Sequence, residues 1–355
     1  MPEAFAPVGA RAATQLFVSL PPMDTIRMGI LGAARIAPAA LIRPATPNLE
    51  VDVTALAARD LARGEAFAAT HGIPRVLPDY RALVEDTDID AVYIPLPNGL
   101  HGVWTKAALA AGKHVLCEKP FTANADEAAS VVAAWEANPK LVVMEAFHYR
   151  YHPLFRRVQE LIESDVIGTV RHIETRMCFP LPMRKDIRWQ LDLAGGALMD
   201  AGCYAVHMLR HLAGSEPEVT RAKAKQLTPG VDRLVQAEYH LPDGTTGRTV
   251  CSMLSSHVLR IGFTVAGDAG RIDVFNPMAP QMFHRIVVRG KAGRRVEHSV
   301  KRPTYDFQLE AFADAVLRDV PPVTDALDAL ANMTVIDSVY RAAGLEPRQP
   351  TAAAA

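Results

Sequence analysis

A lysine at the end of an expected buried strand is the first residue of this sequence that points to chemistry. Residues 113–120 read K-H-V-L-C-E-K-P, and the apolar centre predicts a parallel strand that ends just before Glu118 and Lys119. Ligands of open α/β sheets bind at the carboxyl ends of the strands. A lysine there can donate a proton, accept one or hold a substrate oxygen, because burial readily lowers its pKa. The alternative is an ordinary strand end whose charged side chains face water.

A second group of polar side chains follows a pair of glycines, in G-G-A-L-M-D-A-G-C-Y-A-V-H at residues 195–207. The pattern predicts a helix that runs on to His211. Asp200 and Tyr204 are at positions i and i+4 and share one face of that helix, and His207 overlaps the same face. If this face borders a crevice, it offers a carboxylate, a phenol and an imidazole to a substrate. If it faces solvent, these side chains have no chemical role.

The elements that would position these residues begin with a strand and a glycine-containing turn. Residues 26–31 predict a strand, and G-A-A-R-I-A at residues 32–37 leads into a helix. This is the dinucleotide pattern G-x-G-x-x-G with alanine at its second and third glycines. Alanine nearly allows the close approach of backbone to a pyrophosphate, which would rest on the helix N-terminus. Similar turns are common in proteins that bind no nucleotide, so this turn alone is a weak signal.

The end of the second expected strand indicates which nicotinamide cofactor fits. Residues 51–58 form an apolar strand that ends at Arg59, and Arg63 follows in the next helix. An acidic residue at this place often holds the ribose 2′-hydroxyl of NAD, whereas an arginine suits the 2′-phosphate of NADP. We therefore expect NADP, with NAD as the alternative. Arg59 can also be read as a solvated residue at a strand end.

Strands and helices alternate through the first half of the chain. We expect helices at 61–71, 80–85, 102–111 and 123–138, and further strands at 90–95 and 141–146. This alternation predicts a doubly wound parallel sheet, a Rossmann domain, over residues 26–148. The strand at 90–95 is followed by L-P-N-G-L-H, in which Asn98 either caps the next helix or, together with His101, faces the cofactor.

The second half of the chain has a different pattern, which begins with an amphipathic helix at 151–164. Strand-like runs follow at 169–179, 217–227, 231–241, 246–255, 258–266, 270–275 and 284–298. They predict an open-faced, mainly antiparallel sheet in a second domain at 149–345, so the fold class is α/β followed by α+β. Two helices within 305–343 are expected to pack back on the first domain. We expect residues 1–25 to be a disordered extension without an export signal and 346–355 to be a tail.

Composition excludes several classes of function. The chain has 355 residues, of which 49% are hydrophobic, and this is enough for two domains. Its 38 Lys and Arg residues nearly balance its 39 Asp and Glu residues, so no nucleic-acid partner is indicated. No apolar run approaches the ~20 residues of a membrane span. The four cysteines form no C-x-x-C, so we expect free thiols, a cytoplasmic protein and no metal.

Five motifs, taken in order, resemble one family of oxidoreductases. They are G-I-L-G-A-A-R-I-A, L-P-N-G-L-H, C-E-K-P, M-E-A-F-H-Y-R-Y-H-P and G-G-A-L-M-D-A-G-C-Y. Over about residues 26–345 the chain resembles the glucose–fructose oxidoreductase/inositol dehydrogenase/rhizopine catabolism (Gfo/Idh/MocA) family. Within it, A-A-R-D-L-A-R and D-x-x-x-Y look most like the branch of dimeric dihydrodiol dehydrogenase and NADP-dependent D-xylose dehydrogenase. The resemblance implies hydride exchange between a nicotinamide and a sugar or cyclic polyol.

The resemblance also implies roles for individual residues. It carries the family's E-K-P lysine onto Lys119. Tyr204 stands where the inositol branch has histidine, which makes inositol itself an unexpected substrate, and D-I-R-W implies that Arg188 and Trp189 lie near the nicotinamide. The expected catalytic residues are Lys119, Tyr204 and Asp200; the expected cofactor contacts are Gly32, Ala34, Arg35, Ile36, Arg59, Leu96, Asn98, His101, Glu118, Arg188 and Trp189; and His207 and Tyr149 are expected to bind the substrate.

Oxidation of a secondary alcohol needs a hydride acceptor and a base. Free tyrosine and lysine have pKa values of about 10, too high for a base at neutral pH. We expect Tyr204 to take the hydroxyl proton while Lys119 holds the same oxygen and lowers the pKa of Tyr204, and burial beside the nicotinamide to lower that of Lys119. The reversed assignment is about as economical, and the pair can titrate as one unit. Asp200 would orient the substrate or Lys119.

Other functions remain open from the sequence. A non-catalytic NADP-binding regulator needs only the cofactor turn, so the joint presence of Lys119, Asp200 and Tyr204 disfavours it. An NAD-dependent sugar dehydrogenase, or an oxidoreductase or redox-assisted glycosidase that keeps NAD bound, would have an acidic residue where this chain has Arg59.

Self-association is expected through the sheet of the second domain. Its helices suffice to cover one face only, and an uncovered apolar face normally seeks a partner. The runs 233–240 and 249–255 are expected to supply that face in a homodimer or homotetramer.

Overall fold

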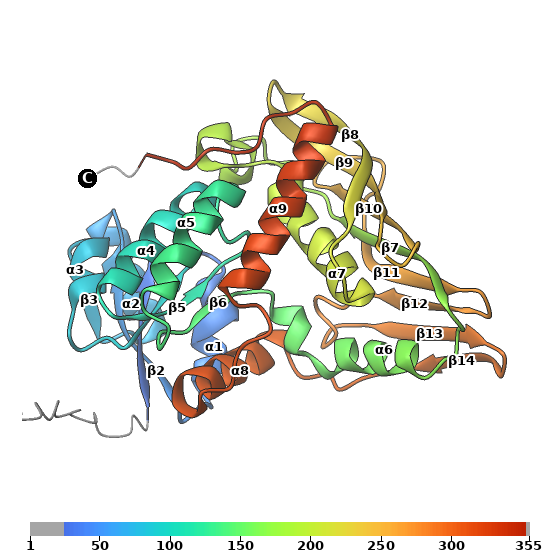
Figure 1. Ribbon diagram of the computed structural model, residues 1–355. Coiled ribbons are helices and arrows are strands. Elements are labelled where there is room, and N and C mark those ends of the chain that lie inside the picture. Colours follow the sequence, from blue (N-terminus) through green and yellow to red (C-terminus); the bar gives the residue numbers. More distant parts are fainter. Residues whose placement is uncertain (1–24, 353–355) are drawn as a thin grey trace, which may run out of the picture.

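The computed structural model describes residues 25–352, so nearly all of the expected N-terminal extension lies outside the described residues. Two sheets lie on opposite sides of a central group of helices (Figure 1). The first sheet is parallel, with the strand order β3-β2-β1-β4-β5-β6. Its strands are β1 (Ile26–Leu31), β2 (Val51–Ala57), β3 (Arg75–Leu77), β4 (Ala91–Ile94), β5 (His114–Cys117) and β6 (Val143–Glu145).

The helices of this domain are α1 (Arg43–Ala45), α2 (Leu61–His71), α3 (Tyr80–Glu85), α4 (His101–Ala110) and α5 (Ala125–Glu136). Three of them, α2, α3 and α5, begin at side chains that act as caps. Asp60, Asp79 and Asn124 accept hydrogen bonds from the first turns of α2, α3 and α5. The short β3 is absent from the sequence-based prediction, because three half-buried residues form no recognisable apolar pattern.

The second sheet has the strand order β14-β13-β12-β11-β7-β10-β9-β8, and every pair is antiparallel except β7 with β10. Its strands are β7 (Val170–Cys178), β8 (Glu218–Thr228), β9 (Val231–His240), β10 (Thr246–Ser252), β11 (Arg260–Gly267), β12 (Arg271–Phe275), β13 (Arg285–Gly290) and β14 (Gly293–Glu297). The run 284–298, expected as one strand, is a hairpin that turns at Gly293, where φ is +91°. The expected fold class is confirmed.

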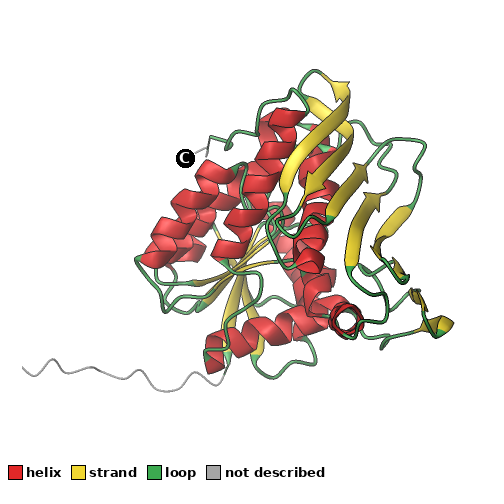
Figure 2. Cartoon of the chain, turned by 45° about the vertical axis from the view of Figure 1, so that its right-hand side comes forward, coloured by secondary structure: helices red, strands yellow, loops and turns green. Residues whose placement is uncertain are grey.

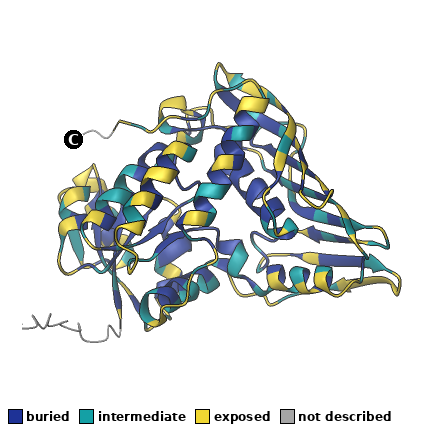
Figure 3. Cartoon of the chain, viewed as in Figure 1, coloured by how far each residue is buried: buried dark blue, intermediate teal, exposed yellow. Residues whose placement is uncertain are grey.

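The remaining helices join the two sheets into one body. They are α6 (Pro153–Glu163), α7 (Cys203–Ala213), α8 (Thr304–Arg318) and α9 (Ala326–Ala342). Helix α9 contacts α5 of the first domain, α7 and β8, while α8 packs Leu309 and Phe312 into the core around β1. The prediction that the last two helices pack back on the first domain is therefore confirmed. In Figure 3 buried residues, drawn in dark blue, are concentrated where these helices pack between the two sheets.

The face of the second sheet that points away from α7 and α9 carries charged side chains as well as the expected apolar ones. Among the described residues no helix covers it (Figure 2). On β7 the residues Ile173 and Thr175 face the core, so Glu174 and Arg176 face outward. Arg176 pairs with Glu174 at 2.6 Å. Apolar side chains also lie on this face, since Val250 is paired in register with Arg176 and Val287 with Asp273.

The part of the chain that the structure describes contains no helix long and apolar enough to cross a membrane.

Candidate active site

A continuous cleft runs along the carboxyl ends of β1, β2, β4 and β5. It consists of two adjoining cavities of about 620 and 440 Å³ that share several lining residues, including Arg35, Leu96 and Asp186. The first domain supplies one wall, and residues 185–193 of the second domain supply part of the other. The cleft thus lies where parallel sheets with this strand order bind dinucleotides.

The turn after β1 fits a pyrophosphate. Gly32 has φ of +99°, and a Cβ atom there would lie 3.1 Å from Leu96 Cδ2. No described residue accepts a hydrogen bond from the backbone N–H groups of Ala33, Arg35 or Ile36. These donors stand at the start of the helical segment that follows, which is the environment that binds phosphate groups. Alanine at the second and third glycine positions of the motif therefore leaves these backbone N–H groups available.

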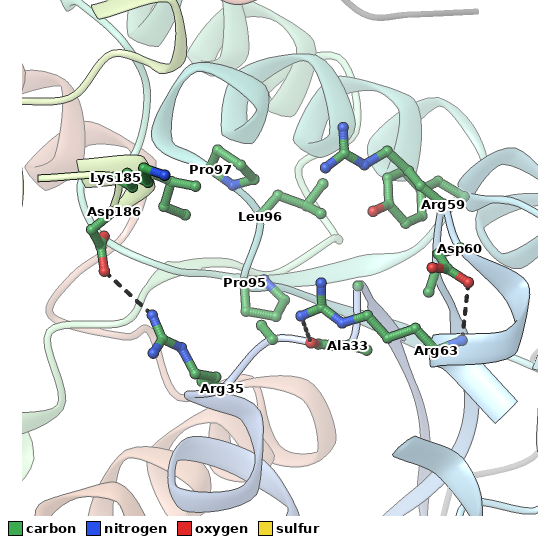
Figure 4. Close-up of a pocket in the computed structure, with 15 residues that line it drawn as sticks. Ala33, Arg35, Arg59, Asp60, Arg63, Pro95, Leu96, Pro97, Lys185 and Asp186 are labelled. Atoms are coloured by element: carbon green, nitrogen blue, oxygen red, sulfur yellow. Dashed lines mark hydrogen bonds and ion pairs between the residues drawn. The ribbon is translucent and has the colours of Figure 1, made fainter. Parts of the chain in front are cut away.

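Two arginines lie together at one end of the cleft (Figure 4). Arg59 and Arg63 both line the first cavity, and Arg63 Nη2 donates to the carbonyl oxygen of Ala33 at 2.8 Å. Tyr80 lies beside Arg59; burial raises the pKa of its hydroxyl, and the positive charge of Arg59 opposes the rise. The side chains of Arg59 and Arg63 would therefore meet a phosphate group attached to the adenosine ribose.

A second-domain carboxylate closes over the middle of the cleft. Asp186 accepts a hydrogen bond from Arg188 Nε at 2.9 Å. It also accepts one from Arg35 Nη2 at 3.3 Å (Figure 4). The hydrogen bond from Arg188 is the main reason why the pKa of Asp186 is lowered to about 2. Arg35 thus contacts the second domain directly across the cleft.

Lys119, Asp200 and Tyr204 meet at the other end. Lys119 Nζ donates to Asp200 Oδ1 and to the Asp200 carbonyl oxygen, both at 3.2 Å, and lies 5.2 Å from the centre of the Tyr204 ring. Arg188 Nη1 lies 3.6 Å from Asp200 Oδ2. The side chains of Lys119 and Asp200 are only 15% and 11% exposed. Strand β5 delivers the lysine, and the π-helical turn Leu198–Gly202 with the first turn of α7 delivers its two partners.

The electrostatics of this end keep both Lys119 and Tyr204 protonated. Burial alone would lower the pKa of Lys119, but the negative charge of Asp200, with smaller contributions from Cys203 and Glu118, raises it above the ordinary value for lysine. The expected lowering of this pKa is therefore not what the structure shows. Burial raises the pKa of the Tyr204 phenol well above its usual range. Both groups are thus proton donors as they stand.

The remaining predicted residues of the cleft have distinct surroundings. Glu118 accepts a hydrogen bond from Tyr93 at 2.8 Å, and burial raises its pKa. Asn98 caps no helix; its amide donates to the carbonyl oxygen of Ala194 in the second domain. His101 places its ring nitrogens 2.8 Å from Leu96 O and 2.6 Å from Pro120 O, and burial lowers its pKa to about 4. His101 therefore joins the two strand-end loops beneath the cleft.

Three predicted site residues do not line the two cavities. Trp189 is buried beside Arg188. Tyr149 and His207 are also buried, with 2.6 Å between the Tyr149 hydroxyl and His207 Nδ1. Phe147 stacks on the His207 ring and meets the Tyr204 ring edge-on, so it lies between these two side chains, while the centre of the Tyr149 ring is 6.1 Å from that of Tyr204. Tyr149 and His207 can therefore support Tyr204 from behind but do not face the cleft.

His207 also belongs to a cluster whose composition would suit a metal ion. Its Nε2 and that of His211 each lie 3.0 Å from an oxygen of Asp328. However, Arg150 Nε donates to His211 Nδ1 at 3.2 Å, so His211 must carry its own proton on Nε2. Arg210 Nη1 also donates to Asp328 at 3.0 Å. The cluster is therefore held together by hydrogen bonds, and His211 has no lone pair directed at a metal.

Several residues of the cleft were missed by sequence reasoning. Tyr305, at the start of α8, lines the cavity that holds Lys119, and the centre of its ring lies 4.2 Å from that of His148. Tyr80 and Lys185 line the arginine-rich cavity. Tyr305 follows Tyr204 by about a hundred residues and lies in no recognised motif, so only the packing of α8 against the first domain reveals it.

Comparison with known proteins covers both domains. Residues 26–146 match the family model described as an oxidoreductase family with an NAD-binding Rossmann fold, and residues 155–273 match the Gfo/Idh/MocA C-terminal domain. The chain is 38% identical over 318 residues to D-xylose 1-dehydrogenase (NADP(+)) 2 of Haloferax volcanii, which covers 89% of this chain and 96% of that protein. It is 35% identical over 236 residues to trans-1,2-dihydrobenzene-1,2-diol dehydrogenase of Oryctolagus cuniculus, covering 66% and 70% of the two chains.

Among solved structures, the chain is similar to KijD10, a 3-ketoreductase from Actinomadura kijaniata in complex with NADP and TDP-benzene. The TM-score is 0.84 at 29% sequence identity, and the alignment covers 90% of this chain and 98% of that one. Both sheets and the helices between them therefore follow the same arrangement.

Proposed function

Because this chain belongs to the Gfo/Idh/MocA family of oxidoreductases, we propose that it transfers a hydride between NADP and a secondary hydroxyl or carbonyl group of a sugar or cyclic diol. The observation that carries this proposal is the cleft itself. One end holds Arg59 and Arg63 beside a dinucleotide turn, and the other holds the buried contact between Lys119 and Asp200 next to Tyr204. A dinucleotide that spans the cleft would bring its nicotinamide to the lysine end.

The chemistry at the lysine end follows from the protonation of its residues. A bound nicotinamide supplies or accepts the hydride. In the direction of carbonyl reduction, the Lys119 ammonium and the Tyr204 phenol both donate hydrogen bonds to the carbonyl oxygen, and one of them gives it a proton as the alkoxide forms. Asp200 fixes Lys119 at 3.2 Å and balances its charge. In the direction of alcohol oxidation, the same pair must first lose one proton and then takes the hydroxyl proton.

The proposal is tested by a substrate screen. Purified protein is mixed with NADP or NAD and with D-xylose, other aldoses or trans-cyclic diols, and the reduced nicotinamide is followed by absorbance. Turnover with NADP supports the proposal. Firm NADPH binding without turnover of any sugar or diol would contradict it and would favour a cofactor-sensing regulator.

The preference for NADP is carried by the two arginines. A phosphate held by guanidinium groups gains charge-assisted hydrogen bonds, worth on the order of 1.5–3 kcal/mol. The acidic side chain near the end of β2, Asp60, is engaged as the cap of α2, where it accepts the backbone N–H of Arg63. The similarity to an NADP-dependent xylose dehydrogenase supports the same preference.

We also propose that copies of the chain associate through the uncovered face of the second sheet. This face carries charges of both signs in close alternation, among them Arg176 with Glu174 and Arg289 with Asp273. A surface of this kind can pair with a second copy of itself around a twofold axis. Sedimentation at micromolar concentration should give a dimer or larger species that dissociates as salt is added; a monomer at low salt would contradict it.

The cysteines support a reducing, cytoplasmic location for the protein. Cys117, Cys178, Cys203 and Cys251 are all buried as free thiols. Proteins of oxidising compartments commonly use their cysteines in disulfides. Fractionation of source cells with an antibody against the protein would test the location, and recovery from the periplasm or medium would contradict it.

A further inference from the structure

The segment that follows α9 binds the turn on which the catalytic residues depend. Arg348 is 2% exposed; its Nη2 lies 2.5 Å from Asp232 Oδ1, and its Nε donates to the carbonyl oxygen of Gly195 at 2.7 Å. The other oxygen of Asp232 accepts the backbone N–H of Leu198 at 2.6 Å. The Tyr340 hydroxyl donates to Asp232 at 3.1 Å. This segment, taken as a tail from the sequence, thus forms a buried ion pair with β9.

The two glycines of the turn are in contact with this ion pair. Gly196 has φ of +138°, and a Cβ atom there would lie 2.2 Å from Asp232 Oδ1 and 2.7 Å from Arg348 Nη2. On the other side, a Cβ atom at Gly195 would lie 2.7 Å from the carbonyl oxygen of Arg188. The turn is therefore confined between the ion pair and the backbone of the segment that contacts Asp200.

The confined turn leads directly to the catalytic carboxylate. The backbone N–H of Asp200 donates to the carbonyl oxygen of Gly196 at 3.0 Å. Leu198, whose N–H is held by Asp232, opens the π-helical turn that contains Asp200. A displacement of the Gly195–Gly196 turn would therefore move Asp200 away from Lys119.

The same segment also contacts the first domain. The Asn124 amide donates to the carbonyl oxygen of Arg348 at 2.7 Å, and the backbone N–H of Thr351 donates to Gly99 at 2.8 Å. The Thr351 hydroxyl donates to the carbonyl oxygen of Asp192 at 2.6 Å. In Figure 1 this segment leaves the end of α9 and runs back toward the C-terminus past α5. It thus links the loop after β4 to the segment just before the glycine turn.

We propose that Arg348 is a positioning residue for the hydride-transfer reaction: its ion pair with Asp232 fixes the Gly195–Gly196 turn and thereby holds Asp200 against Lys119. The proposal rests on the proposed function, because it presumes that Lys119 acts in catalysis. A buried ion pair carries a large desolvation cost, and an apolar contact would suffice to anchor a chain end. Precise placement of the turn that leads to Asp200 is a reason for a buried ion pair at this position. Small displacements of reacting groups slow reactions strongly.

The kinetic test compares Arg348→Met, Arg348→Lys and the matched control Gln349→Ala. Gln349 is the next residue, is exposed, and its side-chain amide donates to the carbonyl oxygen of Pro347. Arg348→Met should lower kcat on the order of ten- to a hundredfold with little change in the Kd of NADPH. Arg348→Lys should recover part of the loss, and Gln349→Ala should match the wild type. An unchanged kcat in folded Arg348→Met, or an equal loss in Gln349→Ala, would overturn the proposal.

A second measurement needs no substrate and separates this proposal from the proposed function. Reductive methylation followed by peptide mass spectrometry reports how fast each lysine reacts. Arg348→Met should react severalfold faster than the wild type at Lys119, once Asp200 is displaced. Lys113, which is 7% exposed and donates to the carbonyl oxygens of Asp86 and Ile89, should react at the same rate in both.

The labelling pattern decides between positioning and general loosening. Faster reaction confined to Lys119 supports the proposal even if the wild type turns over no sugar or diol. Equal acceleration at Lys119 and Lys113, or no acceleration at either, would overturn it. If Arg348→Met does not fold, Asp232→Asn removes the same ion pair while keeping the side-chain shape, and the same two patterns apply.

Discussion

The two ends of the cleft hold their charges in opposite ways. At the arginine end, Arg59 and Arg63 are exposed, so each guanidinium group is hydrated and screened by salt. At the lysine end, Lys119 and Asp200 are nearly buried and in contact. Exposed charges act almost independently, whereas buried charges depend on one another. We therefore expect changes at the arginine end to alter cofactor choice modestly and changes at the lysine end to alter the rate strongly.

The largest effect is expected when the phenol at the lysine end is removed. Tyr204→Phe should lower the rate of hydride transfer by about 10²- to 10⁴-fold, because a positioned proton donor is lost. The Kd of NADPH should hardly change, since Tyr204 lies far along the cleft from the arginines. Adding Lys119→Met to this variant should slow it little further, because groups that act as one unit are not additive. Stopped-flow absorbance measures all of these rates.

Tyr80→Phe is the matched control for this prediction, since it removes a phenol from the arginine end of the same cleft. It should leave the rate of hydride transfer near that of the wild type. Equal rate losses in Tyr80→Phe and Tyr204→Phe would show that the rate of hydride transfer does not depend on the lysine end in particular.

A change in pH dependence is the next effect in size. The Asp200 carboxylate raises the pKa of Lys119, so the ammonium form persists to higher pH than in free lysine. Asp200→Asn removes this stabilisation, and Lys119 should then lose its proton about one to three pH units lower. Carbonyl reduction, which uses the ammonium form, should fall off at correspondingly lower pH. A pH–rate profile whose alkaline limb stays in place in Asp200→Asn would show that Lys119 does not control that limb.

Residues that follow buried strands could be located from the sequence, whereas residues placed by the packing of distant segments could not. The first sheet was predicted well because its strands are buried on both sides and read as continuous apolar runs. Lys119 and Arg59 follow such runs, so their places at the strand ends were predictable. The place of His207 relative to the cleft was not predictable, because nearly all of α7 is buried and the helical period could not show which face borders the cleft. Tyr305 could not be found because its position depends on the packing of two distant segments.

The burial of Arg348 could not be predicted from the sequence either. The last residues carry no apolar periodicity, and nothing in R-Q-P-T distinguishes a surface tail from a buried strap. Its burial depends on Asp232 and on the tight approach at Gly196. Likewise, alternation in β7 predicted a strand but not the pairing of Arg176 with Glu174 on its outer face.

A smaller effect is expected at the arginine end. Arg59→Ala should reduce the preference for NADP over NAD by about ten- to a hundredfold, the equivalent of one charge-assisted contact. The rate of hydride transfer with saturating NADPH should remain close to that of the wild type. Titration of both cofactors by fluorescence gives the ratio, and Arg43→Ala, a substitution outside the cleft-lining residues, is the control. A ratio unchanged from the wild type would mark Arg59 as a solvated strand end.

The smallest effect is expected at the Asp186 contact that closes the middle of the cleft. Because hydrogen bonds from Arg188 lower the pKa of Asp186 to about 2, the contact stabilises the folded protein above the unfolded pKa of about 4. The stabilisation is lost as the pH falls from about 4 toward 2. Asp186→Asn should lower the melting temperature at pH 6 by no more than about 2–4 °C. The difference from the wild type should shrink as the pH falls through the folded-state pKa of about 2 and vanish below it. A difference that persists below this pH would contradict this origin.

The most direct test of the division between the two ends is a single-turnover measurement on Lys119→Met. The variant is first loaded with NADPH, its Kd is recorded, and a carbonyl substrate found in the screen is then mixed in while the loss of NADPH absorbance is followed. The account predicts a Kd close to that of the wild type and hydride transfer slower by about 10²- to 10⁴-fold. Near-wild-type transfer in the loaded variant would contradict it.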